Sequence, residues 1–308
     1  MRILNLLLCA TVVASSGCSV RKFAINKIGD ALAQGGSTYQ SDEDLELVQG
    51  ALPFGLKLVE TMLEESPKHR GLLFAASQGF TSYAYLAVQQ DLDRAKGNDY
   101  ELEDRLRARA RRLYLRAHRY GLRGMEVAHP GFSSTFSLKP REAVTALNKK
   151  DLPLLYWTAA SLGLAISCSR DDVDMIARIP EVEALIDRAL ALDDTWNYGA
   201  FHEFAIVLAG AKPGDIDYGA VSVHYERAVA LSKGASASVH VTYAETVDVQ
   251  KQERQEFQQM LERALAVMPG EENKDLRLTN ELAQRRASWL LSRIDHLILA
   301  PVVEKENQ

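Results

Sequence analysis

A short helical pattern recurs three times in the second half of the chain, and it constrains the fold more than any other feature of the sequence. Each copy reads acidic residue, Arg, Ala, apolar residue, Ala, apolar residue, and the copies lie at residues 187–192, 226–231 and 262–267. The arginines of successive copies are 39 and 36 residues apart. One such segment is a common amphipathic helix, but three in near register, each followed by a turn, indicate stacked helix pairs.

The residue types within the repeat explain how such pairs would pack. The small alanine lets adjacent helices approach, the flanking apolar side chains fill the groove, and the acidic residue and Arg face outward. A weaker copy at residues 114–117 precedes the first by two periods of 36 residues, and the helix expected over 152–167 is apolar nearly all round and therefore central. Because one pair cannot bury its own apolar face, neighbouring pairs must stack. We predict an all-α, TPR-like array of stacked helix pairs that forms a single domain over residues 41–300.

The rest of the mature sequence also follows a helical period, with apolar residues three and four positions apart. Residues 236–243 alternate weakly, but a single strand would have nothing to pair with, so a helix is expected there. Pro and Gly mark the expected breaks between helices. These breaks fall at Ser66-Pro67, Gly97-Asn98, His129-Pro130-Gly131, Pro180, Pro213-Gly214, Lys233-Gly234 and Pro269-Gly270.

A charged stretch at residues 91–112 is expected to be a solvated helix with a turn at Gly97-Asn98. Two interpretations remain open for its arginines: a basic patch, or a solvated face in which acidic neighbours offset them. Nearby acidic residues favour the solvated face. The arginines are Arg105, Arg107, Arg109, Arg111 and Arg112, and the acidic residues are Glu101, Glu103 and Asp104.

The N-terminal 17 residues have the layout of a secretory signal peptide. A short basic start precedes an apolar run over residues 3–13, and small residues lead to Cys18. The run is too short to cross a bilayer, which takes about 20 residues. Ser15-Ser16-Gly17-Cys18 resembles a bacterial lipobox, although Leu is usual where Ser15 stands. We therefore expect Cys18 to be lipidated and to become the first mature residue, with an ordinary signal peptide as the alternative.

Residues 18–40 are expected to form the lipid anchor and a tether. Apolar residues over 23–32 predict one short amphipathic helix, and residues 34–37 then break it. Ser41 to Asp44 is a capping pattern ahead of a periodic apolar run, so the folded domain is expected to start there. Residues 301–308 are expected to be a C-terminal tail. By resemblance to lipoprotein sorting in Gram-negative bacteria, Ser19 implies the periplasmic side of the outer membrane.

Composition limits the class of protein. The formal net charge of −5 argues against a general nucleic-acid binder, which needs a basic surface. Of three cysteines, Cys9 lies in the signal peptide, Cys18 is the expected anchor, and Cys168 ends the central helix. No intramolecular disulfide is therefore expected, and Cys168 is expected to be a small buried residue, because free Cys is among the most buried residue types.

A search for catalytic or cofactor motifs finds none. His202-Glu203 begins like a zinc-binding HExxH motif, but Ile206 occupies the position of the second histidine. Residues 234–238 lack the final Gly of a nucleophile elbow. Glycine-rich phosphate motifs are absent, and the seven histidines show no short metal-ligand spacing. The sequence predicts no catalytic residue, no metal site and no cofactor.

Aromatic residues cluster near several expected helix starts. Tyr and Trp carry large apolar area with one polar tip, which suits the wall of a pocket. For each residue alone a core position is the simpler interpretation, but the set predicts a ligand-binding or partner-binding surface. Its members are Tyr83, Tyr85, Tyr156, Trp157, Trp196, Tyr198 and His202.

An ordered set of short segments resembles the T-component family of tripartite ATP-independent periplasmic (TRAP) transporters. The resemblance covers most of the mature chain, and the C-terminal segments match best. The segments are Leu52-Pro-Phe-Gly-Leu56, Gly79-Phe-Thr-Ser-Tyr83, Ala110-Arg-Arg-Leu-Tyr-Leu-Arg116, Tyr120-Gly-Leu122, Tyr156-Trp-Thr-Ala-Ala160, Trp196-Asn-Tyr-Gly-Ala200, His202-Glu-Phe204, Tyr225-Glu-Arg-Ala228, Glu256-Phe257, Leu276-Arg-Leu-Thr-Asn280 and Ala283-Gln-Arg-Arg-Ala-Ser-Trp-Leu-Leu291.

The resemblance implies a non-catalytic periplasmic lipoprotein with a TPR-like helical fold and a hydrophobic cleft. It implies association with the periplasmic solute-binding protein of the transporter, binding of a hydrophobic or organic-acid ligand, and a trimer in some relatives. Two alternatives remain: a generic TPR-like envelope scaffold without a small ligand, and a periplasmic enzyme of unrecognised type. Capture of a solute-binding protein would favour the transporter component over the scaffold. A pocket of strongly perturbed titratable groups would favour the enzyme.

Overall fold

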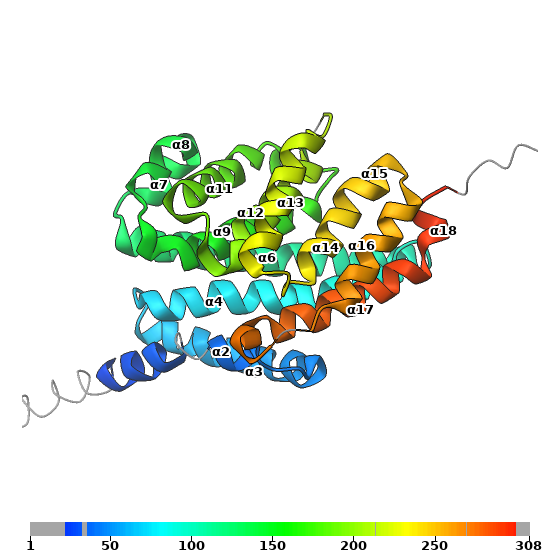
Figure 1. The fold of residues 1–308 in the computed structure, drawn as a ribbon. Coiled ribbons are helices and arrows are strands. Elements are labelled where there is room, and N and C mark those ends of the chain that lie inside the picture. Colours follow the sequence, from blue (N-terminus) through cyan, green and yellow to red (C-terminus); the bar gives the residue numbers. More distant parts are fainter. Residues whose placement is uncertain (1–21, 33–35, 213, 269, 300–308) are drawn as a thin grey trace, which may run out of the picture. The chain divides into compact units, whose positions relative to one another are not determined.

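The computed structural model describes residues 22–32, 36–212, 214–268 and 270–299, and every regular element in these ranges is a helix. The prediction of an all-α chain is therefore confirmed, and the TPR-like description fits the helix order (Figure 1). No helix of the described part combines the length and the apolar character that crossing a bilayer requires. The predicted signal peptide, Cys18 and the tail over 301–308 lie outside the described residues.

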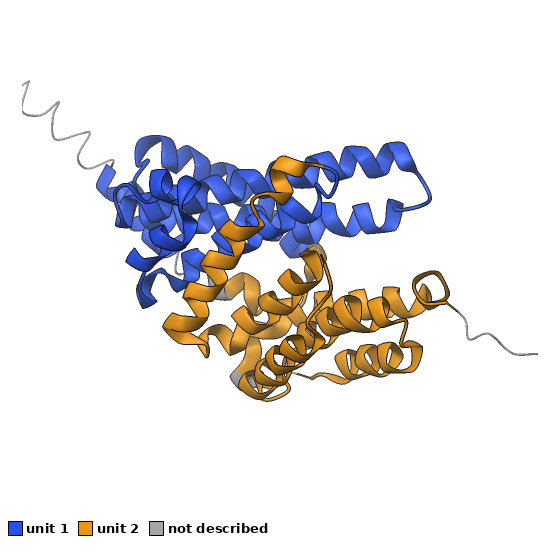
Figure 2. Cartoon of the chain, turned by 90° about the horizontal axis from the view of Figure 1, so that it is seen from above, with its two compact units in different colours: residues 1–37, 47–171 blue, residues 38–46, 172–308 orange. Residues whose placement is uncertain are grey.

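The chain divides into two compact units, coloured separately in Figure 2. Unit 1 comprises residues 1–37 and 47–171, and unit 2 comprises residues 38–46 and 172–308. The helices of unit 1 are α3 (Leu45–Glu65, which starts in unit 2), α4 (Arg70–Tyr83), the π-helical η1 (Ala84–Gln89), α5 (Gln90–Ala95), α6 (Tyr100–Ala128), α7 (Phe132–Leu138), α8 (Pro140–Ala143), the 3-10 turns η2 (Val144–Ala146) and η3 (Lys149–Asp151), and α9 (Leu152–Ser167).

Unit 2 contains the three clear repeat copies. Its helices are α10 (Val173–Ile176), α11 (Ile179–Asp193), the 3-10 segment η4 (Trp196–Gly199), α12 (Ala200–Ala211), α13 (Tyr218–Ser232), α14 (Ser238–Tyr243), the π-helical η5 (Ala244–Asp248), α15 (Val249–Lys251), α16 (Arg254–Ala266), η6 (Glu271–Leu276), α17 (Arg277–Ser292) and α18 (Ile294–Leu297). The short α2 (Gly36–Gln40) precedes α3, so Gly36 and Ser37 of the predicted break begin a new helix, and residues 33–35 lie outside the described residues.

The repeat copies lie in α11, α13 and α16, where each first alanine is buried. Ala189 and Ala264 are fully buried and Ala228 is 3% exposed, while the acidic residue before each arginine is exposed. Successive helices contact one another in the order α11, α12, α13, α14, α16 and α17. Small residues at the crossing points and acidic residues outside confirm the packing that the repeat predicts.

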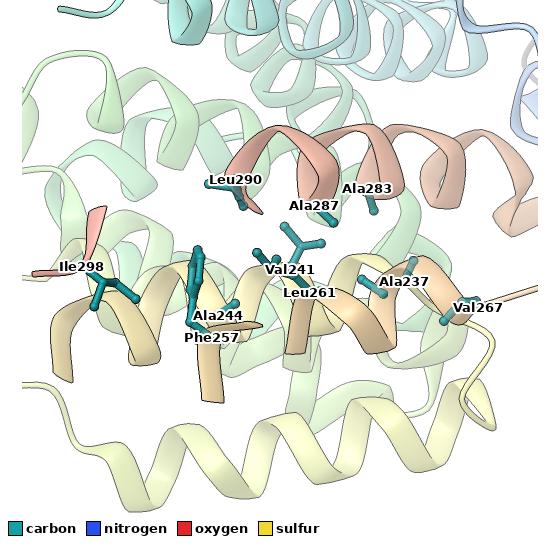
Figure 3. Close-up of a cluster of buried hydrophobic side chains, with 11 residues drawn as sticks. Ala237, Val241, Ala244, Phe257, Leu261, Val267, Ala283, Ala287, Leu290 and Ile298 are labelled. Atoms are coloured by element: carbon teal, nitrogen blue, oxygen red, sulfur yellow. The ribbon is translucent and has the colours of Figure 1, made fainter. Parts of the chain in front are cut away.

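The last helices of unit 2 enclose an apolar cluster between α14, α16 and α17 (Figure 3). Phe257 and Leu261 of α16 are fully buried in it, and Ala283 and Ala287 of α17 lie opposite. At about 25 cal/mol per Å² of buried apolar surface, a large aromatic such as Phe257 contributes roughly 2–3 kcal/mol. The small alanines of α17 allow α16 to approach closely enough for that burial.

Unit 1 is built around α9, which has the predicted bounds, and α6. Ten residues of α9 are buried, as a helix that is apolar on all sides requires. Helices α6 and α9 approach closely at Gly121 of α6, where an added Cβ would lie 2.2 Å from Oγ1 of Thr158 on α9. Cys168, at the end of α9, is buried as predicted. The helix over residues 22–32 also packs on this unit, because Ser66 donates a hydrogen bond of 2.8 Å to Asn26.

Candidate functional site

The aromatic residues predicted as a binding surface divide between the two units. Tyr83, Tyr85, Tyr156 and Trp157 belong to unit 1, and Trp196, Tyr198 and His202 belong to unit 2.

Tyr83 and Tyr85 lie where α4 continues into the π-helical segment η1. Tyr83 is half-buried, and its hydroxyl accepts a hydrogen bond of 2.9 Å from Arg109. Tyr85 is 38% exposed. π-helical turns within α-helices are rare and often lie at functional positions. The sequence offered no signal for the π turn, since residues 84–89 have an ordinary helical pattern.

Tyr156 and Trp157 pack edge to face on α9, with ring centroids 5.1 Å apart. Both rings are half-buried, so each keeps part of its surface accessible. They support a partly open aromatic surface in unit 1.

Trp196 and Tyr198 lie in a short distorted segment, η4, rather than at the start of a regular helix. Asn197 and Tyr198 have positive φ values of 47° and 57°. Gly199 follows with φ 81°, and an added Cβ would lie 3.0 Å from Leu231. Left-handed backbone at residues other than Gly costs about 1–3 kcal/mol and is often found at functional sites. The turn places the ring centroid of Trp196 5.0 Å from that of Phe201.

His202 belongs to a buried polar chain that also contains a second histidine. Its Nδ1 lies 2.8 Å from Nδ1 of His224, so one ring donates and the other accepts. Its Nε2 is buried without a hydrogen-bond partner, although Oδ2 of Asp194 lies 3.5 Å away. Arg227 pairs with that carboxylate at 2.9 Å. Burial, and then the neighbouring His224, lowers the pKa of His202, and burial also lowers the pKa of His224.

Glu203, the next residue, is a carboxyl group without a cationic partner in the described part of the chain. Its two oxygens accept hydrogen bonds from Ser238 at 2.8 Å and Thr242 at 3.2 Å, both on α14. Burial raises the pKa of Glu203, and the two hydroxyl groups only partly offset this effect. The side chain still keeps some solvent exposure. The only sequence signal for this residue was the incomplete zinc motif, which pointed to the wrong chemistry.

A third buried polar contact joins α13 to α14. The hydroxyl of Tyr225 lies 2.8 Å from Nδ1 of His240 and 3.4 Å from the sulfur of Met260. Burial, and then Arg263, lowers the pKa of His240 to about 4. His240 is therefore neutral at pH 7 and can only share a hydrogen bond with the phenol.

Asp248 ends the second π-helical segment, η5, and is buried at 1% exposure. Its Oδ2 has no hydrogen-bond partner. Burial, followed by the nearby carboxylates of Glu253 and Glu256, raises the pKa of Asp248 to about 7. No sequence pattern selects Asp248, because its burial depends on how η5 packs in the folded unit.

These groups suit binding better than catalysis. Burial raises the pKa of the Cys168 thiol to about 11, so it is not a nucleophile at neutral pH. Among the described residues, no group of three His, Cys, Asp or Glu side chains could hold a metal ion. What remains in unit 2 is a set of mostly neutral hydrogen-bonding groups on α12, α13 and α14, beside aromatic rings. Hydrogen-bonding groups beside aromatic rings can orient a small molecule.

Helices that bring polar side chains and aromatic rings together within unit 2 point to a binding or accessory protein. The family model described as "TRAP transporter T-component" matches residues 41–298, and the chain belongs to this family. The family is a transporter accessory rather than a known enzyme family. The chain is also 26% identical over 310 residues to an uncharacterized protein of Treponema pallidum (strain Nichols), with 94% of this chain and 96% of that protein covered.

Proposed function

We propose that this chain is a non-catalytic periplasmic lipoprotein that binds the solute-binding protein of a TRAP transporter. The observation that carries the proposal is the family match over residues 41–298, which places the chain with a transporter component. Stacked helix pairs offer an extended rigid surface to a partner. The chain shows no energy-coupling motif, so transport itself would be driven by the membrane partners.

Direct binding tests this proposal. The full mature chain is immobilised, and the purified solute-binding protein of a TRAP transporter from the same organism is passed over it. We expect saturable binding that an unrelated periplasmic binding protein does not reproduce. If the solute-binding protein does not bind, either with or without its solute, the proposal is contradicted and the generic envelope scaffold is favoured.

A small ligand is the second part of the proposal. The polar and aromatic groups around Trp196, His202 and Glu203 would contact a hydrophobic solute or an organic acid. The chain has three tryptophans, and Trp289 packs against the apolar cluster of α14, α16 and α17, beside Arg286 and Arg293. A variant that keeps only Trp196 should change its fluorescence with ligand, and a variant that keeps only Trp289 serves as the matched control. No response of the Trp196 signal across a panel of organic acids and lipids would argue against this site.

The anchor is a separate part of the proposal. Lipidation at Cys18 would place the protein on the periplasmic side of the outer membrane, and several acyl chains would make that anchoring stable. Cys18→Ala should give a soluble or unprocessed protein in cell fractionation. Unchanged membrane attachment and mobility of the variant would contradict lipidation.

A further inference from the structure

Six arginines lie in one row along α6 of unit 1. They are separated by alternating intervals of four and three residues, which places them on one face of the helix. At about 1.5 Å per residue the row is about 27 Å long. Its members are Arg105, Arg109, Arg112, Arg116, Arg119 and Arg123.

Every second arginine of the row is held over an aromatic ring. These three also donate to fixed acceptors: Arg109 to the hydroxyl of Tyr83, Arg116 to Glu60, and Arg123 to the carbonyl of Pro67 at 3.0 Å. The distances from guanidinium carbon to ring centroid are 5.8 Å for Arg109 and Tyr83, 4.6 Å for Arg116 and Phe80, and 5.4 Å for Arg123 and Tyr120. Stacking of this kind fixes a guanidinium in place without neutralising it, and of these three arginines Arg116 is the one that also pairs with a carboxylate, that of Glu60.

The other three arginines have no partner in the described part of the chain. Arg105, Arg112 and Arg119 are exposed, seven residues apart, and therefore about 10 Å apart along the helix. Two of the nearby acidic residues lie against Arg107, which is outside the row: Arg107 binds Glu103 and lies 3.7 Å from Asp104. Only Glu101, one turn before Arg105, shares the face of the row. The row therefore keeps a strong local positive charge on a chain whose net charge is −5.

An apolar row lies beside the arginines. Ala108 is exposed, and Leu115 and Leu122 are half-buried, each three residues after an unpaired arginine. Over residues 105–123 no large hydrophobic side chain is exposed, so this face lacks the apolar side chains that insert into a bilayer. Evenly spaced, pre-positioned guanidinium groups beside a shallow apolar row suit carboxylates on a folded protein surface.

We infer that the arginine row of α6 is the docking face for an acidic surface of a protein partner, with carboxylates at intervals of about 10 Å. The inference rests on the proposed function, in which that partner is the solute-binding protein. The unpaired arginines would bind the carboxylates of the partner. The stacked arginines would add to the positive electrostatic potential of the row and keep its side chains in fixed positions.

The test compares two triple variants of the full mature chain. One carries Arg105→Gln, Arg112→Gln and Arg119→Gln. The control carries Arg141→Gln, Lys149→Gln and Lys150→Gln, which remove the same charge from exposed positions of the same unit. The affinity of each for the purified solute-binding protein is measured at about 50 mM and about 500 mM salt. A third variant, with the three α6 arginines changed to lysine, keeps the charge.

We expect the Kd of the α6 glutamine variant to rise about tenfold or more at low salt and to lose most of its salt dependence. The control should bind as the wild type does, and the lysine variant should lie between. Equal binding by wild type and the α6 variant would overturn the docking face and leave the proposed function standing. Failure of the wild type to bind at all would overturn the proposed function, and the docking face with it.

Two other partners are tested in the same series. If the α6 substitutions reduce sedimentation with vesicles containing about 30% phosphatidylglycerol and leave protein affinity unchanged, the face binds lipid and the inference is overturned. If they change only the self-association of the chain in analytical ultracentrifugation, the occupant is a second copy and the inference is overturned as well.

Discussion

The two units treat their buried carboxyl groups in opposite ways. In unit 1, Asp151 is 1% exposed and binds Arg70, His129 at 2.9 Å and the backbone N–H of Asn148 at 2.8 Å. Burial acts to raise its pKa, but these three partners together hold the pKa below its usual range. In unit 2, burial raises the pKa of Glu203 and takes that of Asp248 to about 7.

This contrast separates buried polar groups that stabilise the fold from buried polar groups that are candidates for binding a ligand. The buried acids of unit 1 are neutralised by bases of their own unit, so they hold helices together. In unit 2, Glu203 accepts hydrogen bonds from hydroxyl groups alone and Oδ2 of Asp248 has no partner. The histidines His202, His224 and His240 of this unit all have lowered pKa values. Groups that cost stability without compensation are the ones most often kept for a ligand.

The largest expected effect is at Asp151 in unit 1. Asp151→Asn removes the charge that Arg70 and His129 share and leaves a partly buried cation without compensation. Loss of one partner of a buried ion pair costs roughly 3–5 kcal/mol. Urea unfolding followed by circular dichroism measures the change in the free energy of unfolding. The matched control is Asp171→Asn at an exposed aspartate of the same unit, which should stay within about 0.5 kcal/mol. Equal effects of the two substitutions would show that the Asp151 network is not stabilising.

The next effect is a pH dependence that belongs to Asp248 in unit 2. Its pKa in the folded state, about 7, lies above the ordinary value of 3.8, so folding favours the protonated form. The associated stability is fully present below about pH 4 and is lost as pH rises to about 7. The loss is on the order of 4 kcal/mol, because each unit of difference between the two pKa values is worth about 1.4 kcal/mol. Asp248→Asn should remove this part of the pH dependence and raise the melting temperature at pH 8.

Thermal melts at pH 4.5, 6 and 8 check the Asp248 effect, with the exposed Glu226→Gln as control. His240 acts in the opposite direction, because its lowered pKa of about 4 removes stability as pH falls from 6.5. The comparison is therefore made between wild type and variant at each pH. If Asp248→Asn melts at a lower temperature than the wild type at pH 8, the Asp248 carboxylate has a compensating partner and the prediction is wrong.

A smaller effect is expected from the phenol between α13 and α14. Tyr225→Phe removes the 2.8 Å hydrogen bond and leaves Nδ1 of buried His240 without its partner. An unsatisfied buried polar group costs about 1–2 kcal/mol. Urea unfolding measures the loss, and Tyr100→Phe, at a tyrosine that is 77% exposed, is the control. A loss no larger than that of the control would mean that water replaces the phenol and that this part of unit 2 is open.

The fold could be predicted because the repeat encodes it locally. Ala189, Ala228 and Ala264 had to be small and buried for the pairs to stack, and they are. The uniformly apolar pattern over residues 152–167 likewise allowed only a central helix, and α9 has those bounds. The division into two units left no comparable signal, since it depends on which distant helices contact one another.

The candidate site could be predicted only in part. The aromatic pattern selected His202, but its partners His224 and Asp194 come from other helices and have no sequence spacing that links them. Burial of Asp248 follows from a π turn, which adds one residue per turn and changes the face that a side chain occupies. On α6 the arginine run was visible in the sequence, but the pattern did not show that Glu103 and Asp104 lie against Arg107. It therefore did not show which arginines of the run stay without a partner.

The smallest expected effect is at Glu203, and its sign is the most informative. Glu203→Gln keeps the shape and the bonds from Ser238 and Thr242 but removes a charge that no base compensates. Because the pKa of Glu203 is raised, its contribution to stability is present below about pH 4.5 and is lost as pH rises through the folded pKa. The variant should therefore be more stable than wild type by about 1 kcal/mol at pH 8 and equal to it at pH 4.5. Urea unfolding at both pH values measures this, with the exposed Glu226→Gln as control. A destabilised variant at pH 8 would mean that Glu203 has a cationic partner after all, and the two units would then treat their buried acids alike.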